Sequence, residues 1–138
     1  MIKFNQINIK TPKRETLLDI SNEINSLVRN SGIKEGTCRI FVPHTTAGIT
    51  MNENADPNVL IDIINYLKIL IPQNGGKYAF KHIEGNSDAH LKSSLIGTSL
   101  ELIIHDGKIV LGTWQGIMFA EFDGPRNRKV IIQIIGEK

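Results

Sequence analysis

The sequence predicts an α+β domain with helices packed on mainly antiparallel sheet, and three observations indicate this class. Two segments, near residues 20–31 and 56–72, carry apolar residues at the spacing of an amphipathic helix. Short β-branched and apolar runs precede, separate and follow them. The resulting order, ββαββα followed by several strands, lacks the steady alternation of strand and helix that a parallel α/β fold shows.

Length and composition favour one domain spanning residues 1–138. Of the 138 residues, 41% are hydrophobic and 22% charged, which is enough apolar surface for a full core without disulfides. The one cysteine, Cys38, lies in an apolar strand-like run and is expected to be buried rather than reactive. The formal charge of +2 is spread along the chain, with almost no aromatic residues between the basic ones, which argues against a nucleic-acid groove.

The compartment is expected to be the cytoplasm. The first residues lack the basic and then apolar layout of a signal peptide. No apolar run approaches the roughly 18 residues of a membrane span, so no membrane partner is expected.

The N-terminal segment alternates apolar and polar residues with one change of phase. Ile2 and Phe4 share one phase, whereas Ile7 and Ile9 share the other. This pattern predicts a strand with a bulge or break. Residues 14–18 are expected to return as the second strand of a hairpin.

Two main helices follow from apolar spacing and end signals. The first covers about 20–31, with Asp19 available as N-cap and Gly32 placed just past its end. The second begins at Asp56, an N-cap followed by Pro57 at the first helical position. A single apolar stripe along it predicts one buried face.

Strands and a short helix account for the rest of the chain. Segments 37–42 and 47–52 predict two strands around the polar corner 43–46, which holds His44. The long segment 73–86 has no clear periodicity and is expected to be a functional loop. The remaining elements are expected to be a short helix over about 88–96, capped by Ser87 and closed by Gly97, and strands over 99–105, 108–111, 114–122 and 129–135. The apolar run 130–135 predicts a strand buried on both faces, in a central or interface position.

Three of the four histidines, His44, His82 and His90, lie in expected loops or helix starts. The positive end of its helix would keep His90 neutral, as a metal ligand or general base. Brought together by the fold, with Glu53 or Asp56 as an oxygen ligand, the three imidazoles would suit a catalytic zinc ion with an open position. Two simpler explanations stay open. His90 would only pack beneath its helix, and Asp56 would only cap the second main helix.

Groups that bind anions gather at two further places. Segment 121–128 concentrates two carboxylates and two arginines at a tight turn, where the Arg126 fork could hold phosphate or carboxylate. The helix start at Asn86 and Ser87 offers unpaired backbone N–H groups to an anion. The alternative for segment 121–128 is a solvated turn whose charged side chains form only surface ion pairs. Trp114, the only tryptophan, is most simply explained by core packing.

Taken together, five segments are similar to the motifs of the YjbQ-like family, in its order and spacing over nearly the whole chain. They are PHTTAGI (43–49), NENADP (52–57), GNSDAHLK (85–92), LGTWQ (111–115) and EFDGPRNR (121–128). The resemblance implies two β-sheets and a homotrimer with sheets packed about the threefold axis, in which Arg126 can serve a neighbour's pocket. It also implies a weak secondary thiamine-phosphate synthase activity and a polar pocket made of His44, Glu53, Asp56, His82, Asn86, His90, Trp114, Gln115, Glu121 and Arg126.

The residues and the resemblance together predict a small-molecule site, with two main explanations. In the first, an enzyme, a divalent cation held by the histidines and Glu53 polarises a phosphorylated substrate; zinc is preferred, with magnesium or manganese as alternatives. Its catalytic residues would be Glu53, His90, Glu121 and Arg126, and its anion contacts Asn86, Ser87, Trp114, Gln115 and Arg126. In the second, the trimer binds a small anionic metabolite or a metal ion without turnover. A purely structural network that holds the trimer together is a third, weaker explanation.

Overall fold

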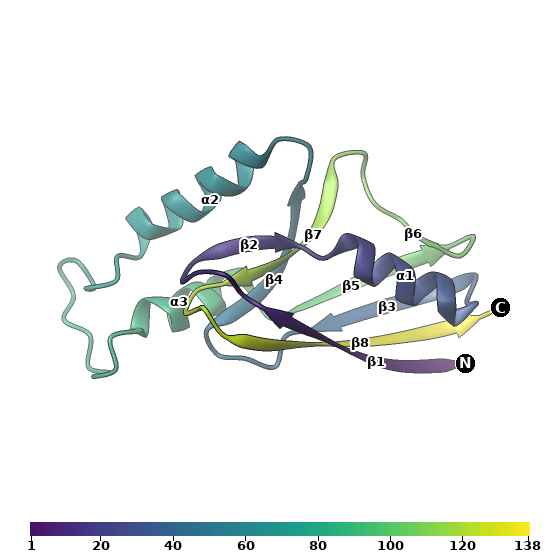
Figure 1. The fold of residues 1–138 in the computed structure, drawn as a ribbon, viewed down its shortest axis with the longest axis horizontal. Coiled ribbons are helices and arrows are strands. Elements are labelled where there is room, and N and C mark those ends of the chain that lie inside the picture. The colour runs from purple at the N-terminus through teal and green to yellow at the C-terminus, as the bar shows by residue number, and fades with distance from the viewer.

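Two antiparallel β-sheets and three helices make up the computed structural model, which describes residues 1–138 (Figure 1). The strands are β1 (Ile2–Lys10), β2 (Thr16–Asp19), β3 (Glu35–Phe41), β4 (Ala47–Glu53), β5 (Ser99–His105), β6 (Lys108–Ile109), β7 (Gln115–Glu121) and β8 (Asn127–Glu137). The helices are α1 (Ser21–Ser31), α2 (Pro57–Leu70) and α3 (Ser87–Ile96). The predicted α+β class is confirmed, including the two antiparallel sheets that the family resemblance implied.

The larger sheet has five strands in the order β1-β8-β3-β5-β6. β8 lies in its interior, paired along its length with β1 and with β3, which confirms a central position for the last apolar run. The side chains of Val130, Ile132 and Ile134 are fully buried on one face of β8. Ile131 and Ile135, on the other face, are only half-buried. Within one chain, β8 is therefore fully buried on one face, not on both.

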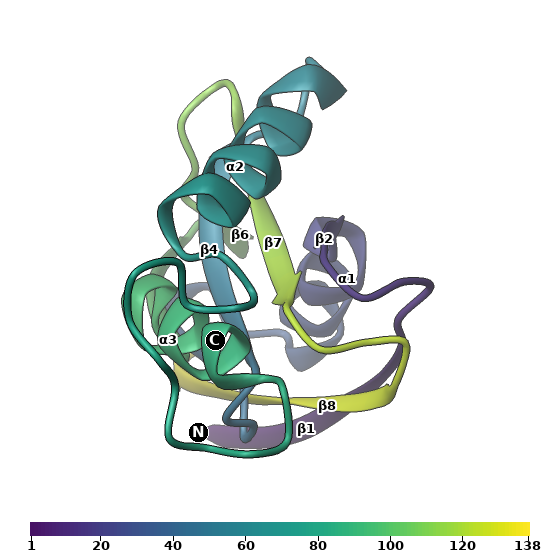
Figure 2. The ribbon, with the colours of Figure 1, turned by 90° about the vertical axis from the view of Figure 1, so that its left-hand side faces the viewer.

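The smaller sheet has three strands in the order β2-β7-β4. β3 and β4 do not pair, because residues 43–46 carry the chain from the larger sheet to the smaller one. Figure 2 shows β4 and β7 running across the direction of β8 and β1. The corner around His44 is thus a junction between sheets, and the far end of β4 points away from it.

The N-terminal hairpin and the bulge predicted from the sequence are both wrong. β1 pairs with β8 in one continuous register over its nine residues. The change of phase reflects two apolar faces, since Ile7 and Ile9 pack on the core whereas Ile2 and Phe4 are exposed on the opposite face. Residues 16–19 form β2, which pairs with β7 in the smaller sheet rather than with β1.

The helix ends largely follow the local signals. Gly32 closes α1 with a left-handed φ of 73°, a conformation that favours glycine. Asp56 caps α2 by accepting a backbone N–H of its first turn at 2.9 Å. Asp19 accepts the N–H of Ser21, although Ile20 occupies the N-cap position of α1. At α3 the N-cap is Asn86 rather than the predicted Ser87, and its side chain makes no capping bond.

The core fixes where α2 and α3 lie. A cluster of 17 buried residues fills the space between the two sheets and α1, and it includes Cys38, which is fully buried as predicted. A second cluster of seven lies on the opposite face of the smaller sheet, where Met118 and Ala120 of β7 meet Ile64 of α2 and Ala89 of α3. Each large aliphatic side chain buried there stabilises the fold by roughly 2 kcal/mol.

The segment that joins α2 to α3 lies at one end of the molecule, and both chain termini lie at the other (Figure 1). This segment, 71–86, contains the long loop that the sequence singled out. None of the three helices is long and apolar enough to cross a membrane.

Candidate functional site

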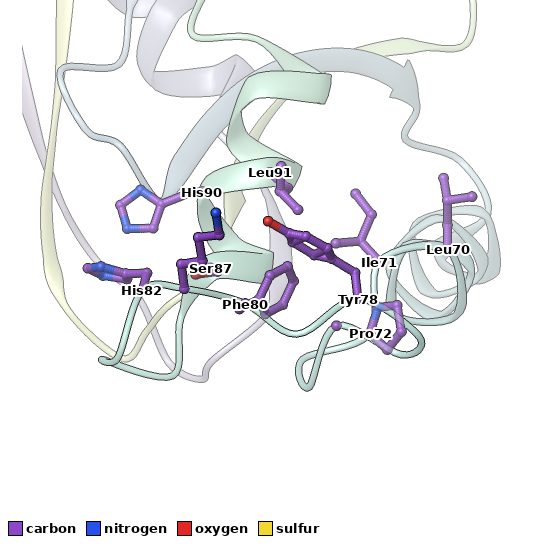
Figure 3. A pocket seen from close by; sticks show the side chains of 11 residues that line it. Leu70, Ile71, Pro72, Tyr78, Phe80, His82, Ser87, His90 and Leu91 are labelled. Atoms are coloured by element: carbon purple, nitrogen blue, oxygen red, sulfur yellow. The ribbon is translucent and has the colours of Figure 1, made fainter.

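His82 and His90 face each other where the α2–α3 segment enters α3 (Figure 3). Their ring centroids are 5.5 Å apart and their planes stand at 88°, an edge-to-face arrangement. His82 comes from the loop and His90 from the first turn of α3. Nε2 of His82 lies 3.5 Å from a carboxylate oxygen of Glu84. Two of the three histidines predicted to meet are therefore neighbours.

These histidines border a cavity of about 710 Å³, called here the histidine pocket. Part of its wall is apolar and aromatic, and part is polar, with side chains from the loop and from α3 in both parts. The lining residues are Leu70, Ile71, Pro72, Gly75, Tyr78, Phe80, Lys81, His82, Ser87, His90 and Leu91. Figure 3 shows the rings of Tyr78 and Phe80 between the histidines and the end of α2; they pack edge to face with centroids 5.9 Å apart.

His44 lies on the other side of His90. The two residues line a second, polar depression of about 490 Å³ together with Thr45, Ser93, Ser94, Gly97 and Thr98. Nε2 of His44 accepts the backbone N–H of Lys129 at 2.9 Å, so only Nδ1 is free. Burial lowers the pKa of His44, and the positive charge of Arg128 lowers it further. His44 is therefore a neutral hydrogen-bonding group at neutral pH.

The start of α3 is joined to the 123–126 turn. The Asn86 amide donates to Asp123 at 3.0 Å, and its own oxygen is buried without a hydrogen-bond partner. The Arg126 guanidinium donates to the backbone oxygen and carboxylate of Asp123, at 2.7 and 2.9 Å. Arg126 is 53% exposed yet folded back onto its own turn. An incoming anion would have to compete with Asp123 for this arginine.

Glu121 is the acidic residue of a buried ion pair. Its carboxylate is fully buried and accepts hydrogen bonds from Arg128 and from the hydroxyl of Thr11. Burial raises the pKa of Glu121, but these hydrogen bonds outweigh burial and hold the pKa below its ordinary value. Glu121 does not line the histidine pocket. Its position suits a group that fixes the junction near Thr46, which Arg128 also contacts.

Glu53, Asp56, Trp114 and Gln115 lie at the far end of the smaller sheet. Glu53 pairs in register with Gln115, whereas Ala47, which follows the His44 corner, pairs with Glu121. Six residues of strand separate the two ends, which is roughly 20 Å. Trp114 is 61% exposed at this far end, so core packing does not explain it. Within one chain the predicted site residues therefore fall into two groups.

The five predicted metal ligands do not meet within one chain. The only histidines, cysteines and carboxylates that bring three ligand atoms within 4.8 Å of one another are Glu35, His105 and Asp106, all exposed at the β5–β6 turn. There, Glu35 raises the pKa of His105 through a hydrogen bond. A metal at the predicted site would need side-chain movement or ligands from another chain.

A four-membered ion network, which sequence reasoning missed, holds α3 in place. The buried carboxylate of Asp88 accepts hydrogen bonds from both terminal nitrogens of Arg14, at 3.1 and 3.2 Å. Lys92, buried to 1% exposure, donates to Asp88 at 2.8 Å and to Glu15 at 2.6 Å. Burial raises the pKa of Asp88, but the bonds from Arg14 and Lys92 outweigh it and lower the pKa. The spacing of Asp88 and Lys92, one helical turn, was the available signal.

Comparison with known proteins supplies the relationship. The family model described as "UPF0047 protein YjbQ-like" matches residues 5–137. A UPF0047 protein of Methanocaldococcus jannaschii is 62% identical over 94% of this chain and 92% of its own length. The UPF0047 protein YugU of Bacillus subtilis is 45% identical over 94% of this chain and 97% of its own.

Solved structures agree. A YjbQ/UPF0047 family protein of Clostridium acetobutylicum superposes with a TM-score of 0.91 at 50% identity, over 95% of this chain and 99% of that one. A protein of unknown function from Sulfolobus solfataricus superposes with a TM-score of 0.93 at 36% identity, over 99% of each chain. Sequence motifs, fold and near-complete coverage coincide, and the chain belongs to the YjbQ-like UPF0047 family.

Proposed function

We propose that the histidine pocket binds a small molecule that combines an apolar or aromatic ring with an anionic group, a phosphate in the first instance. The observation that carries this proposal is the division of the cavity. Tyr78, Phe80 and Leu91 supply an apolar wall, and the polar groups gather at one side. Such a cavity, with a few convergent polar groups, is the usual form of a small-molecule site.

The polar side of the pocket suits an anion. His82 and His90 offer imidazole N–H donors, Lys81 an ammonium group and Ser87 a hydroxyl. Ser87 is also the first residue of α3, whose start has no side-chain cap. The first N–H groups of a helix lack intrahelical partners and favour negative charge. A phosphate placed there would meet donors from the loop and from the helix together.

Catalysis at this pocket is the finer part of the proposal. His90 could act as a general base toward a bound ligand, because it lines both the histidine pocket and the depression that holds His44. The reaction that the family resemblance suggests is a weak thiamine-phosphate synthase activity, in which a thiazole phosphate displaces pyrophosphate from a pyrimidine pyrophosphate. Both substrates join an aromatic ring to phosphate, the combination that the pocket favours. Binding without turnover is the alternative.

A divalent metal ion is a second proposal for the same region, with zinc preferred over magnesium or manganese. The observation that favours it is the proximity of His82 and His90, which could supply two nitrogen ligands. Elemental analysis of untagged wild type beside His82→Ala and His90→Ala tests it. An equimolar ion lost from both variants would support a metal site. A metal-free wild type that also fails to take up added zinc, manganese or magnesium would contradict it.

Assembly as a homotrimer is a further part of the proposal. Phe4, Phe41 and Ile131 line a shallow apolar depression on the outer face of the larger sheet, and the first two are 67% and 46% exposed. Exposed apolar surface of this kind is typical of an interface between chains. In a trimer, Glu53, Trp114 and Gln115 of one subunit could complete the histidine pocket of another.

The binding test uses phenyl phosphate as probe, with phenol and inorganic phosphate as partial probes. Calorimetry is expected to show that phenyl phosphate binds more tightly than phenol or inorganic phosphate. His82→Ala and His90→Ala are expected to weaken it about tenfold, as lost hydrogen bonds to a charged group predict. His105→Ala, which removes an exposed histidine elsewhere, is the matched control. Equal affinity of all three variants and wild type would contradict the proposal.

Turnover is tested separately. Wild-type protein is incubated with the pyrimidine pyrophosphate and the thiazole phosphate, and thiamine phosphate is measured by chromatography. Product that disappears in His90→Ala and in Glu53→Gln would support an enzyme. Substrates recovered unchanged while phenyl phosphate still binds would favour the binding module.

A further inference from the structure

A second, strongly polar cavity of about 890 Å³ lies beside the histidine pocket and shares Pro72 with it. It is called here the basic groove. It lies between the β1–β2 connection, the end of α2 and the 73–85 loop, and it is lined by Lys13, Arg14, Glu15, Lys68, Pro72, Gln73, Asn74, Gly85 and Lys92. Apart from Pro72, no lining residue is apolar, which sets the groove apart from the aromatic-walled histidine pocket.

The charges of the basic groove do not cancel. Arg14 and Lys92 are neutralised by Glu15 and Asp88, in the ion network that holds α3. Lys13 and Lys68 are exposed and have no carboxylate within ion-pair distance, although both line the groove. Two positive charges therefore line this cavity without a counter-charge, whereas Arg14 and Lys92, which also line it, are already paired with carboxylates.

Amide groups of the loop add donors at the same cavity. Asn74 uses its side-chain oxygen to accept the backbone N–H of Gly76, which leaves its NH₂ group free to donate. Gln73 donates to the backbone oxygen of Gly85 at 3.3 Å and so connects the two ends of the loop. The groove thus combines lysine ammonium groups with a neutral amide donor, a set suited to phosphate oxygens.

We propose that the basic groove binds the phosphate ester of a polar small molecule, such as a sugar phosphate, at a site separate from the histidine pocket. Lys13 and Lys68 hold the phosphate, and Asn74 contacts it or the first hydroxyl group. The polar residues that line the groove favour a ligand that carries hydroxyl groups over one that carries an aromatic ring. Neighbouring hydroxyl groups instead meet the polar side chains of the loop.

The test compares two double variants that remove the same net charge. Lys13→Ala/Lys68→Ala alters the groove, whereas Lys3→Ala/Lys108→Ala removes two exposed lysines of the larger sheet. Calorimetry with a hexose 6-phosphate at low salt is expected to show saturable binding to wild type and to the control. The groove variant is expected to bind about tenfold or more weakly, because two charge-assisted contacts are lost. The unphosphorylated hexose is expected not to bind.

Further outcomes separate this site from the histidine pocket. His82→Ala is expected to leave hexose phosphate binding unchanged, and the groove variant to leave phenyl phosphate binding unchanged. Equal weakening in the two double variants would show general attraction to net charge and would overturn the groove. The absence of saturable hexose phosphate binding by wild type would overturn it too, whatever phenyl phosphate does.

Discussion

Buried carboxylates in this protein are matched with buried cations residue by residue. Glu121 is enclosed with Arg128 and Asp88 with Lys92, while Arg14, which also binds Asp88, keeps 29% of its side chain exposed. In such pairs the attraction between charges is largely offset by the loss of water around them. Removing one partner is costly, however, because the other stays buried without compensation. Both pairs therefore constrain which substitutions the fold tolerates next to the candidate site.

Glu121→Gln is expected to lower the free energy of unfolding by about 3 kcal/mol at neutral pH, since Arg128 then faces a neutral partner. The effect depends on pH. The folded-state pKa of Glu121 is held below its ordinary value of 4.5, so its stabilisation is complete above that value and is lost as pH falls through the folded-state pKa. Urea denaturation should therefore show that the difference in free energy of unfolding between Glu121→Gln and wild type becomes smaller as the pH is lowered.

Two controls test this account of Glu121. Glu101→Gln makes the same chemical change in an exposed pair with Arg39 and is expected to cost well under about 1 kcal/mol. The double variant Glu121→Leu/Arg128→Met removes both buried charges and is expected to be more stable than Glu121→Gln. A Glu121→Gln variant as stable as wild type, but inactive, would instead support the catalytic role predicted from the sequence.

At the scale of single elements, Asp56 has two proposed roles that one substitution separates. As the N-cap of α2 it accepts the N–H of Asn58, and its loss is expected to cost about 1 kcal/mol. Asp62→Ala, in the exposed middle of the same helix, removes a carboxylate without removing a cap and is the matched control. Urea denaturation should show a lower free energy of unfolding in Asp56→Ala and no change in Asp62→Ala. A change in bound metal that accompanies Asp56→Ala would restore the ligand role.

Elements were predictable where their signals are local. The cap at Asp56 and the left-handed Gly32 each depend on neighbours along the chain, and each is found in the structure. The apolar stripe of α2 is buried in part, since Ile64 and Leu67 are buried whereas Leu70 is 59% exposed. Strand pairing depends on distant residues, and sequence patterns did not reveal it. β2 could equally have paired with β1, and its partner β7 lies about a hundred residues further on. The bulge inferred from Ile2 to Ile9 failed because alternation does not distinguish a bulge from two apolar faces.

At the scale of the whole molecule, the positions of the candidate site residues were predictable only where they did not depend on pairing between distant strands. His82 and His90 are only eight residues apart in the sequence, and they lie together as predicted, whereas His44 lies on the other side of His90. Placing Glu53 beside His44 required β3 and β4 to pair, and they belong to different sheets. The basic groove was not foreseen, because Lys13 and Lys68 meet only through the packing of α2 on the smaller sheet. The 61% exposure of Trp114 excludes the core-packing alternative and leaves its predicted role as a ligand contact untested.

The two separated groups of site residues make the oligomeric state the decisive property of the whole molecule. Light scattering is expected to give about three times the chain mass of 15.4 kDa. Phe41→Glu is expected to dissociate the trimer, because it places a charge in the apolar depression with Phe4 and Ile131. Ile69→Glu is the matched control, since Ile69 is 75% exposed on α2, away from that sheet face.

The same variants connect assembly to the pocket. If Glu53, Trp114 and Gln115 of a neighbour complete the histidine pocket, Phe41→Glu should weaken phenyl phosphate binding although it lies outside the pocket. Ile69→Glu should leave both the mass and the binding unchanged. A monomeric wild type that binds phenyl phosphate fully would show that one chain holds a complete site, and that Glu53 and Trp114 serve another purpose. A trimer broken by Ile69→Glu and not by Phe41→Glu would move the interface from the larger sheet to α2.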